Sequence, residues 1–281
     1  MNLILQGPVA GPTEINHIAA LAGARRVIPL GAHAYRCEEV DASDAVRAQV
    51  DAACLAARVD GTFIAGGQRL SDFKLVAMDM DSTLITIECI DEIADMQGLK
   101  PQVAEITEAA MRGEIEFRES LMRRVSLLKG LDSAALQQVY QQRLRLSPGA
   151  EAMLAAVKAA GLKTLLVSGG FTFFTDRVKE RLGLDYAHSN VLEIADGKLT
   201  GKVTGEIVDA EEKKRTVERV CAALDISPRQ AIVMGDGAND LRMMGIAGMS
   251  VAFRAKPIVR AQADVALNFS GLDGILNLFE Q

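Results

Sequence analysis

The feature that most constrains this fold is an alternation of short apolar runs with amphipathic helical patterns from about residue 74 onward. The runs Lys74–Met78, Lys163–Val167 and Ala231–Met234 each lead into small or acidic residues, and Ser250–Ala252 and Val265–Leu267 continue the pattern. Strands that alternate with helices pair in parallel, because each parallel connection needs a long crossover. We therefore predict an α/β fold with a doubly wound parallel sheet, whose ligand site lies at the carboxyl ends of the strands.

A long helical block interrupts this alternation between the first and second strands. Helical patterns are expected at Asp91–Gln97, Pro101–Arg112, Phe117–Lys129 and Ser133–Arg143. A block of this length is more than a simple crossover needs, since a whole βαβ connection takes roughly a dozen residues. We predict that it forms a helical cap, at about residues 88–147, inserted into a core that spans residues 71–281.

The first seventy residues follow another pattern. The expected order is strand, helix, strand, strand, helix, strand, at Asn2–Gln6, Thr13–Ala24, Arg26–Leu30, Ala34–Val40, Asp44–Val59 and Thr62–Ala65. This βαββαβ order is that of ferredoxin-like modules. We predict that residues 1–70 form a small α+β module, which the Gly- and polar-containing stretch Gly66–Asp72 links to the core.

Composition excludes several classes of protein. Hydrophobic residues make up 49% and charged residues 24% of the 281 residues, as in globular proteins, so the chain is neither disordered nor fibrous. Aromatic residues at 4% and a net charge of −6 argue against nucleic-acid binding. No apolar run approaches the roughly 18 residues of a membrane span, and the amino terminus does not resemble a signal peptide. We expect a cytoplasmic protein without nucleic-acid or membrane partners, with reduced thiols at Cys37, Cys54, Cys89 and Cys221.

Polar residues follow each of the three main strands. DMDST (Asp79–Thr83) ends the first, and carboxylates this close need a divalent cation or a shared proton. SGG (Ser168–Gly170) ends the second directly before a helix, where a hydroxyl and backbone amides suit an anionic oxygen. GDGAND (Gly235–Asp240) ends the third with oxygen ligands that suit Mg²⁺. Each alone could be an ordinary turn, but together with Lys213 they predict a phosphate and metal site.

These motifs together resemble the haloacid dehalogenase-like (HAD-like) phosphohydrolases. The similarity continues through IECIDEIA, EAAMRGEIEFRESLMRRVSLLKG, VSGGFTFF and AKPIVRAQAD, and extends from about Lys74 to the end of the sequence. The cap sequences are similar to those of members that hydrolyse O-phosphoserine. The resemblance implies Mg²⁺-dependent hydrolysis of O-phospho-L-serine to L-serine and phosphate through an aspartyl phosphate, the last step of serine biosynthesis. Residues 1–70 resemble only loosely the ACT-type module that precedes some bacterial members.

The resemblance also implies roles for the acidic residues. Asp79 would be the nucleophile, and Asp81 would be the general acid and then the general base. Mg²⁺ would be held by Asp79, Asp236 and the backbone carbonyl of Asp81, and Asp240 would orient these ligands.

The phosphoryl oxygens would be bound by three groups: the Ser168 hydroxyl, the Gly169 amide and the Lys213 ammonium. Asn239 would contact the phosphate or a nearby water. Spacing alone leaves Lys213 and Lys214 as alternatives within a charged helical stretch, and the similarity favours Lys213.

The cap would select the substrate. By resemblance, Glu88 would bind the ammonium group and Arg124 the carboxylate of an amino acid. From the residues alone, Arg123 and Arg124 are nearly equal candidates. Met111 and Phe117 would close the pocket with apolar surface, and ordinary helix packing is the alternative for both.

Other functions stay open on sequence grounds. A sibling phosphatase or phosphotransferase could act on another small phosphate, such as phosphohomoserine. A non-catalytic serine sensor is suggested by the N-terminal module, which could also form a homodimer. The three histidines, His17, His33 and His188, fall outside every motif and are expected to be structural or exposed.

Overall fold

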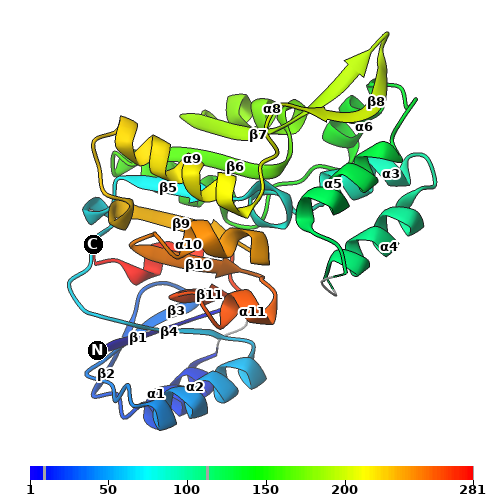
Figure 1. Cartoon of the computed structure of the whole chain (residues 1–281). Coiled ribbons are helices and arrows are strands. Elements are labelled where there is room, and N and C mark those ends of the chain that lie inside the picture. The colour runs from blue at the N-terminus through cyan, green and yellow to red at the C-terminus, as the bar shows by residue number, and fades with distance from the viewer. Residues whose placement is uncertain (9–10, 112–113, 281) are drawn as a thin grey trace.

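The structure is a computed structural model that describes residues 1–8, 11–111 and 114–280, with Met111 described by its backbone only. The described strands form two sheets (Figure 1). One is four-stranded, in the order β2-β3-β1-β4, and the other is seven-stranded, in the order β11-β10-β9-β5-β6-β7-β8. The chain therefore has an N-terminal part, which contains the four-stranded sheet, and a larger α/β part, which contains the seven-stranded sheet.

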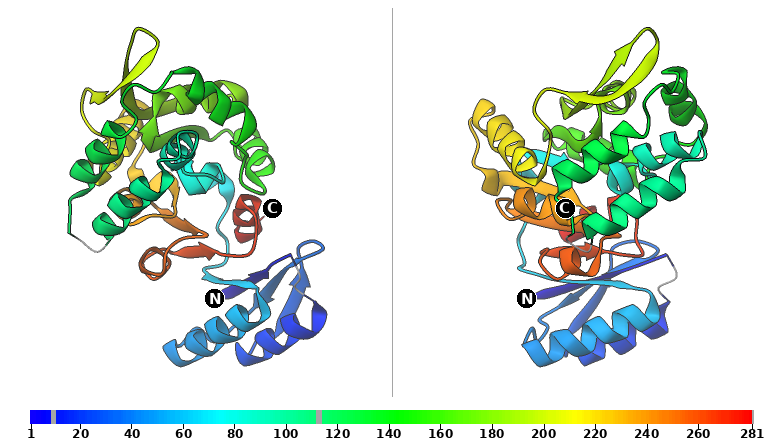
Figure 2. Two further views of the ribbon diagram at one scale, coloured as in Figure 1. Left: turned by 90° about the vertical axis from the view of Figure 1, so that its right-hand side faces the viewer. Right: turned by 45° about the vertical axis from the view of Figure 1, so that its right-hand side comes forward.

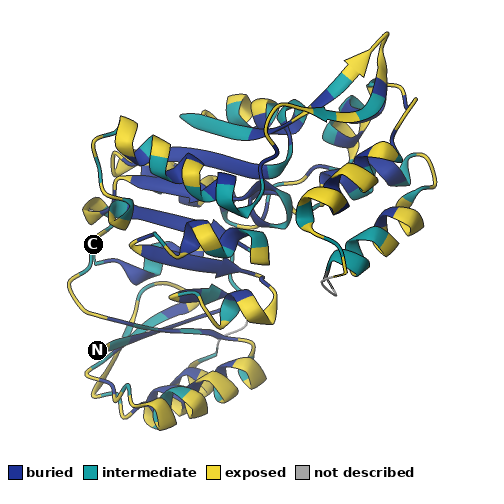
Figure 3. Cartoon of the chain, viewed as in Figure 1, coloured by how far each residue is buried: buried dark blue, intermediate teal, exposed yellow. Residues whose placement is uncertain are grey.

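The larger sheet has β5 at its centre. Its strands are β5 (Leu75–Met78), β6 (Lys163–Phe171), β7 (Tyr186–Ala195), β8 (Lys198–Thr204), β9 (Ala231–Gly235), β10 (Met249–Phe253) and β11 (Val265–Leu267). All neighbouring pairs are parallel except β7 with β8, which is antiparallel. The central strands β5 and β9 are buried along their whole length (Figure 3), as expected for strands covered on both faces.

Helices cover both faces of this sheet. They are α7 (Ala150–Ala159), α8 (Thr172–Leu182), α9 (Ala210–Ala223), α10 (Leu241–Met244) and α11 (Pro257–Arg260). Along β5, Val76 and Met78 share a core with residues of α7 and α8, whereas Leu75 and Ala77 share another core with residues of α9 and α10. Side chains that alternate along a strand point to opposite faces, so this division confirms the predicted doubly wound α/β fold.

The helical cap follows β5. Its helices are α3 (Cys89–Asp95), α4 (Lys100–Met111), α5 (Phe117–Ser126) and α6 (Ala134–Gln142). They gather at the end of the molecule away from the N-terminal sheet (Figure 2). The apolar faces of α3, α5 and α6 join the same core as α7 and α8, so the cap is continuous with the sheet's packing. The boundaries at residues 70, 88 and 147 stay predictions.

The sequence did not predict the full length of β7. From the sequence, the turn pair Asp196-Gly197 predicts a hairpin of Glu193–Ala195 with Lys202–Val208. In the structure, β7 begins at Tyr186 and pairs in parallel with β6 before the chain turns into β8. The start of β7 contains polar residues that break the apolar pattern. One of them, Asn190, donates to Gly169 O (2.8 Å) and accepts from Val208 N (2.9 Å). The strand is thus stabilised by tertiary hydrogen bonds that the local sequence does not reveal.

The N-terminal part has the predicted ferredoxin-like order. Its elements are β1 (Asn2–Gln6), α1 (Pro12–Leu21), β2 (Arg26–Pro29), β3 (Ala34–Glu38), α2 (Asp44–Ala57) and β4 (Asp60–Ile64). All strand pairs are antiparallel, and both helices lie on one face of the sheet (Figure 1). On the other face, Ile4 and Ile64 belong to the same core as Phe73 and Phe279. The small α+β module is therefore packed against the larger part.

A buried carboxylate reinforces this contact. Asp60 is 2% exposed and accepts the backbone N–H groups of Asn268, Phe269 and Ser270 at 2.7 to 3.1 Å. Arg36 donates to the carbonyl of Phe279 at 3.0 Å. Charge-assisted hydrogen bonds of this kind are stronger than neutral ones. The N-terminal sheet is thus joined to the segment after β11 by both apolar and polar contacts.

Three simpler expectations can be compared with the structure. Within the described residues, no helix combines the length and apolarity that a membrane crossing requires. All four cysteines are free and buried. His17 and His33 are exposed, and Nε2 of His188 lies 3.4 Å from Oε1 of Glu212.

Candidate active site

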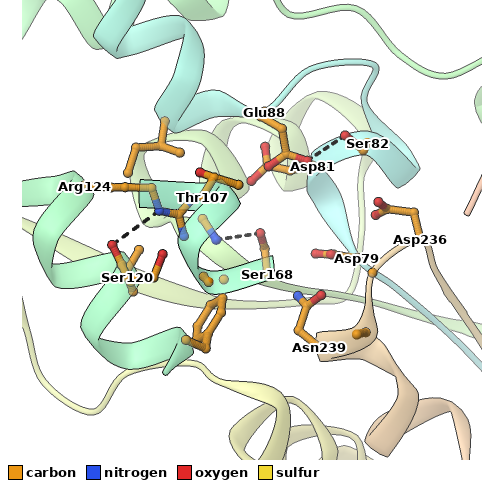
Figure 4. A pocket seen from close by; sticks show the side chains of 18 of the residues that line it. Asp79, Asp81, Ser82, Glu88, Thr107, Ser120, Arg124, Ser168, Asp236 and Asn239 are labelled. Atoms are coloured by element: carbon orange, nitrogen blue, oxygen red, sulfur yellow. Dashed lines mark hydrogen bonds between the residues drawn. The ribbon is translucent and has the colours of Figure 1, made fainter. Parts of the chain in front are cut away.

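A cavity of about 680 Å³ lies between the carboxyl edge of the larger sheet and the cap (Figure 4). Most of the predicted site residues line it: Asp79, Asp81, Glu88, Phe117, Arg124, Ser168, Gly169, Asp236 and Asn239. Carboxyl ends of parallel strands meet at one edge of a sheet, which explains why motifs far apart in sequence converge here. Lys213 and Asp240 lie behind the lining, fully buried. The predicted role of the Met111 side chain falls outside the described residues.

A tight turn after β5 presents two carboxylates to the cavity. Asp79 is buried, and its Oδ1 accepts the N–H of Met80 at 2.7 Å. Ser82 adopts a left-handed backbone conformation (φ 55°), which reverses the chain within the turn. Asp81 then accepts the N–H of Cys89 at 3.1 Å, so the turn is tied to the first residue of α3. The two carboxylates are held by backbone donors on one short segment.

The structure distinguishes Lys213 from Lys214, the two lysines that spacing alone left as alternatives. Nζ of Lys213 lies 2.8 Å from Oδ2 of Asp79 and 2.7 Å from Oδ1 of Asp240. Burial by itself would lower the pKa of Lys213, but Asp240 and Asp79 outweigh it, so the pKa is raised and the ammonium stays charged. Lys214 is half-buried and lies 3.7 Å from Glu218 on its own helix. Lys213 therefore belongs to the site, and Lys214 does not.

An acidic cluster suits a divalent cation. Carboxylate oxygens of Asp79, Asp236 and Asp240 lie within 4.8 Å of one another. Burial, followed by the charge of Asp240, raises the pKa of Asp79 well above its usual range and that of Asp236 to about 7. A cation between them would remove this repulsion. The oxygens of Asp240 accept from three donors, Lys213, Asp236 N and Gly237 N. Asp79 is engaged by two, Met80 N and Lys213, and Asp236 by one, Thr83, so Asp240 has the least capacity left for a cation.

Asp81 differs from this cluster in position and environment. Its side chain is not among the three carboxylates that lie within ligand distance of one another in the described residues. Burial, followed by the nearby charge of Glu88, raises its pKa to about 7. A carboxyl group with a pKa near neutrality can both give up and take up a proton at physiological pH. The environment of Asp81 thus suits acid–base chemistry.

The end of β6 brings a hydroxyl group and two glycines to the cavity. Ser168 is buried, and its Oγ accepts the N–H of Gly170 at 2.9 Å. A Cβ atom at Gly170 would lie 2.6 Å from Oδ2 of Asp81, so a larger residue here would displace the Asp81 carboxylate. A Cβ atom at Gly169 would lie 3.2 Å from the ring of Phe117, which extends from α5 over the strand end. Phe117 is therefore a contact between cap and sheet, as well as part of the pocket wall.

Glu88 introduces an anion from the start of the cap. The Ser82 hydroxyl donates to Oε1 of Glu88 at 2.6 Å (Figure 4). Glu88 is exposed because it faces the open cavity, yet the protein around its carboxylate is dense enough for burial to raise the pKa. This arrangement leaves the carboxylate oriented and accessible to a cationic group.

Arg124 brings a cation to the cap side of the cavity, where Glu88 also lies (Figure 4). Its Nε donates to the carbonyl of Ser120 at 3.4 Å, and its guanidinium forms no ion pair with any described carboxylate. Arg123, on the outer face of the same helix, instead pairs with Glu119 at 2.5 Å. Of the two arginines, only Arg124 lines the cavity. It is therefore free to bind an anionic ligand group.

Several lining residues were not predicted from the sequence. They are Ser82, Asp91, Thr107, Ser120 and Lys256. Four of them lie inside the sequences quoted above: Ser82 in DMDST, Asp91 in IECIDEIA, Ser120 in EAAMRGEIEFRESLMRRVSLLKG and Lys256 in AKPIVRAQAD. The helical spacing of Ser120 and Arg124, four residues apart, was the signal that could have identified Ser120.

Comparison with known proteins agrees with this geometry. The family model of haloacid dehalogenase-like hydrolases matches residues 73–248. A phosphoserine phosphatase from Polaromonas is 62% identical over 215 residues, which cover 75% of this chain and 91% of the relative. A solved structure of phosphoserine phosphatase described as a phospho-aspartyl intermediate analogue is 40% identical, with a TM-score of 0.70, over 74% of this chain and 99% of that one.

The N-terminal part also has a structural counterpart. A crystal structure of a HAD family hydrolase from Salmonella enterica serovar Typhi has a TM-score of 0.90 and 34% identity. It covers 100% of this chain and 99% of its own, so the two molecules share both parts. By the family model and the identity to its relatives, the chain belongs to the haloacid dehalogenase-like hydrolases and, within them, to the phosphoserine phosphatase family of enzymes.

Proposed function

We propose that this chain hydrolyses O-phospho-L-serine to L-serine and inorganic phosphate with Mg²⁺ as cofactor, which would be the last step of serine biosynthesis. One observation carries the proposal: a single cavity combines Asp79 and Asp81 on the sheet side with the opposite charges of Glu88 and Arg124 on the cap side. The first pair suits phosphoryl transfer, and the second matches the two charged groups of an amino acid. The name of the Polaromonas relative supports the same substrate.

The proposed chemistry proceeds in two displacements. A carboxylate oxygen of Asp79 attacks phosphorus in line, the bond to the serine oxygen breaks, and Asp81 gives that oxygen its proton. Asp81 then takes a proton from the water that attacks the aspartyl phosphate, which releases phosphate and restores Asp79. The solved relative with a phospho-aspartyl intermediate analogue supports such an intermediate.

The residues around the phosphate would stabilise charge during transfer. Ser168, the Gly169 amide and Lys213 would donate to the phosphoryl oxygens, with Asn239 beside them. Lys213 lies 2.8 Å from Oδ2 of Asp79, so its ammonium is close to any phosphoryl group attached to that carboxylate. These donors are set in place before substrate arrives, which lowers the cost of reorganisation.

The metal would be held by Asp79, Asp236 and the backbone carbonyl of Asp81, with Asp240 orienting these groups. Carboxylate and carbonyl oxygens are the donors that Mg²⁺ prefers, and the clustered carboxylates fit this requirement. When bound, Mg²⁺ would supply charge neutralisation at the phosphoryl group.

The cap would recognise the amino-acid part of the substrate. Glu88, held by Ser82, would bind the ammonium group, and Arg124 would bind the carboxylate. Phe117 contributes apolar surface beside the phosphate-binding strand end, which would limit access of water to the intermediate. We propose the same for Met111.

The test is a comparison of kcat/KM on phosphoserine, phosphothreonine, phosphohomoserine and phosphoglycolate. We expect phosphoserine to be the best substrate by at least about tenfold. Phosphohomoserine is one methylene longer, phosphothreonine carries an extra methyl group, and phosphoglycolate lacks the ammonium group that Glu88 would bind. A higher value for phosphohomoserine would make the chain a sibling phosphatase. Serine binding without turnover of any of these compounds would identify a sensor. Trapping with beryllium fluoride should place the adduct on Asp79.

A homodimer through residues 1–70 and a cytoplasmic location stay predictions. Sedimentation equilibrium of the full chain and of a chain that lacks residues 1–70 would test the first. A dimer that persists without those residues would contradict it.

A further inference from the structure

The hydroxyl of Ser120 is buried without a partner. Ser120 lies on α5, lines the cavity and is 1% exposed. Its Oγ forms no hydrogen bond with any group in the described part of the chain. Buried polar atoms are paired in the great majority of cases, because an unpaired one loses its hydration without compensation. The position of this hydroxyl therefore needs an explanation.

The other hydroxyl side chains that line the cavity are engaged. Ser82 donates to a carboxylate, Thr107 donates to a backbone carbonyl, and Ser168 accepts a backbone N–H. The hydroxyl of Ser120 alone among these four has no described partner. The missing hydrogen bond is therefore particular to Ser120 and is not a general property of the hydroxyl side chains that line this cavity.

The neighbour of Ser120 indicates what it could bind. Ser120 and Arg124 are one helical turn apart on the same face of α5, and both lie on the same side of the pocket (Figure 4). A guanidinium has only donors, so Arg124 gives the Ser120 O–H no acceptor. An anion bound to Arg124 would supply that acceptor. The two side chains together therefore form a donor set for one anionic group.

We propose that the Ser120 hydroxyl donates a hydrogen bond to the substrate carboxylate beside Arg124, and that it is a specificity-determining residue for the amino-acid group. The inference rests on the proposed function, since it assumes that Arg124 faces a carboxylate. A hydrogen bond from a neutral hydroxyl to a charged oxygen contributes roughly a tenfold or larger effect on binding. Arg124 supplies the charge, and Ser120 orients the carboxylate relative to it.

The test compares Ser120→Ala with the wild type on phosphoserine and on phosphoethanolamine, which has the same phosphate and ammonium but no carboxylate. We expect kcat/KM for phosphoserine to fall at least about tenfold and kcat/KM for phosphoethanolamine to change less than about twofold. Ser126→Ala is the matched control, because Ser126 is exposed on the same helix and donates to Arg123 O. It should change neither value.

Each outcome separates this inference from the proposed function. Failure of the wild type to hydrolyse phosphoserine would overturn the proposed function. Hydrolysis by the wild type with an unchanged Ser120→Ala variant would overturn the inference alone. Equal losses on both substrates, together with a lower melting temperature, would show a structural role and also overturn it. We expect the melting temperature of the free variant to be unchanged or higher, because no hydrogen bond within the described protein is lost. Stabilisation by L-serine should be smaller in the variant.

Discussion

Two regions of the molecule differ in what surrounds their buried carboxylates. At the junction of the two sheets, Asp60 is surrounded by neutral donors, the backbone N–H groups of residues 268–270. At the edge of the larger sheet, Asp79, Asp236 and Asp240 share one described ammonium group, that of Lys213, and the pKa values of Asp79 and Asp236 are raised. Asp60 needs no further partner. The cluster of Asp79, Asp236 and Asp240 instead retains repulsion between like charges, which a purely structural role does not explain. The difference distinguishes a structural carboxylate from a functional set.

The comparison predicts the largest effect for Asp79→Asn. Loss of the proposed nucleophile should reduce kcat by at least about a thousandfold. The free energy of unfolding should be unchanged or increased, because the amide removes one charge from a repelling cluster. Steady-state kinetics and urea unfolding measure the two quantities. A variant that is inactive because it is much less stable would contradict this view of the cluster. As a control, mass spectrometry should confirm that the introduced amide has not hydrolysed back to the carboxylate.

The opposite result is expected for Asp60→Ala. The change leaves three partly buried N–H groups without their acceptor, so we expect a loss of about 3 kcal/mol in the free energy of unfolding. Below the melting temperature of the variant, kcat/KM should stay within twofold, since Asp60 does not line the cavity. Asp41→Ala, at an exposed position of the N-terminal part, is the control and should cost about 0.5 kcal/mol or less. Equal stability of the two variants would remove the structural role of Asp60.

Addition of Mg²⁺ should have different effects on the stability of variants in the two regions. A ligand that binds only the folded state stabilises it by about 2.7 kcal/mol at a hundred times its Kd. We expect Mg²⁺ to stabilise the wild type and Asp60→Ala by the same amount and to stabilise Asp236→Asn much less. Chelation by EDTA should abolish activity until Mg²⁺ is restored. Full activity in EDTA would contradict the metal assignment.

The smallest effect concerns Asp185, a partly exposed carboxylate in a loop between α8 and β7. Burial raises its pKa, but hydrogen bonds from Lys163 and Thr164 outweigh burial and lower it. Its stabilisation is therefore complete above the unfolded pKa, about 4, and is lost as the pH falls through the lower folded pKa. Asp185→Asn should cost about 1 kcal/mol at pH 7 and progressively less below pH 4.

Urea unfolding of wild type and Asp185→Asn across this pH range provides the measurement. A difference that grows as the pH falls would have the wrong sign for a carboxylate stabilised by donors. Asp176→Asn, at an exposed acidic position on α8, supplies a control for the general effect of removing a negative charge.

The convergence of three motifs could be predicted because it follows from the order of strands. Asp79 and Asp236 follow β5 and β9 directly, and Ser168 lies in the last part of β6, which the structure extends to Phe171. Parallel strands place such residues at one edge of the sheet. The long start of β7 could not be predicted. Its polar residues lack apolar alternation, and Asn190 is held by hydrogen bonds to segments distant in sequence.

The local sequence pattern also could not decide which of two neighbouring residues of the same type belongs to the site. Lys213 and Lys214 belong to one charged helical stretch, and Arg123 and Arg124 to another, so residue type does not separate the members of either pair. Packing of α9 against the sheet buries Lys213 beside Asp79, and packing of α5 turns Arg124 toward the cavity. In each pair the direction of the side chain is set by the surface that the helix covers.

The sequence by itself determined the alternation of strands and helices, the inserted cap, the N-terminal βαββαβ order and the residue types at the strand ends. These depend on local periodicity and on the rules that connect neighbouring elements. Only the tertiary structure decided which lysine and arginine face the cavity, why Asp60 and Asp240 are satisfied differently, and that Ser120 is buried without a partner. Burial, electrostatic coupling and hydrogen-bond satisfaction depend on groups far apart in the chain, so no local pattern contains them.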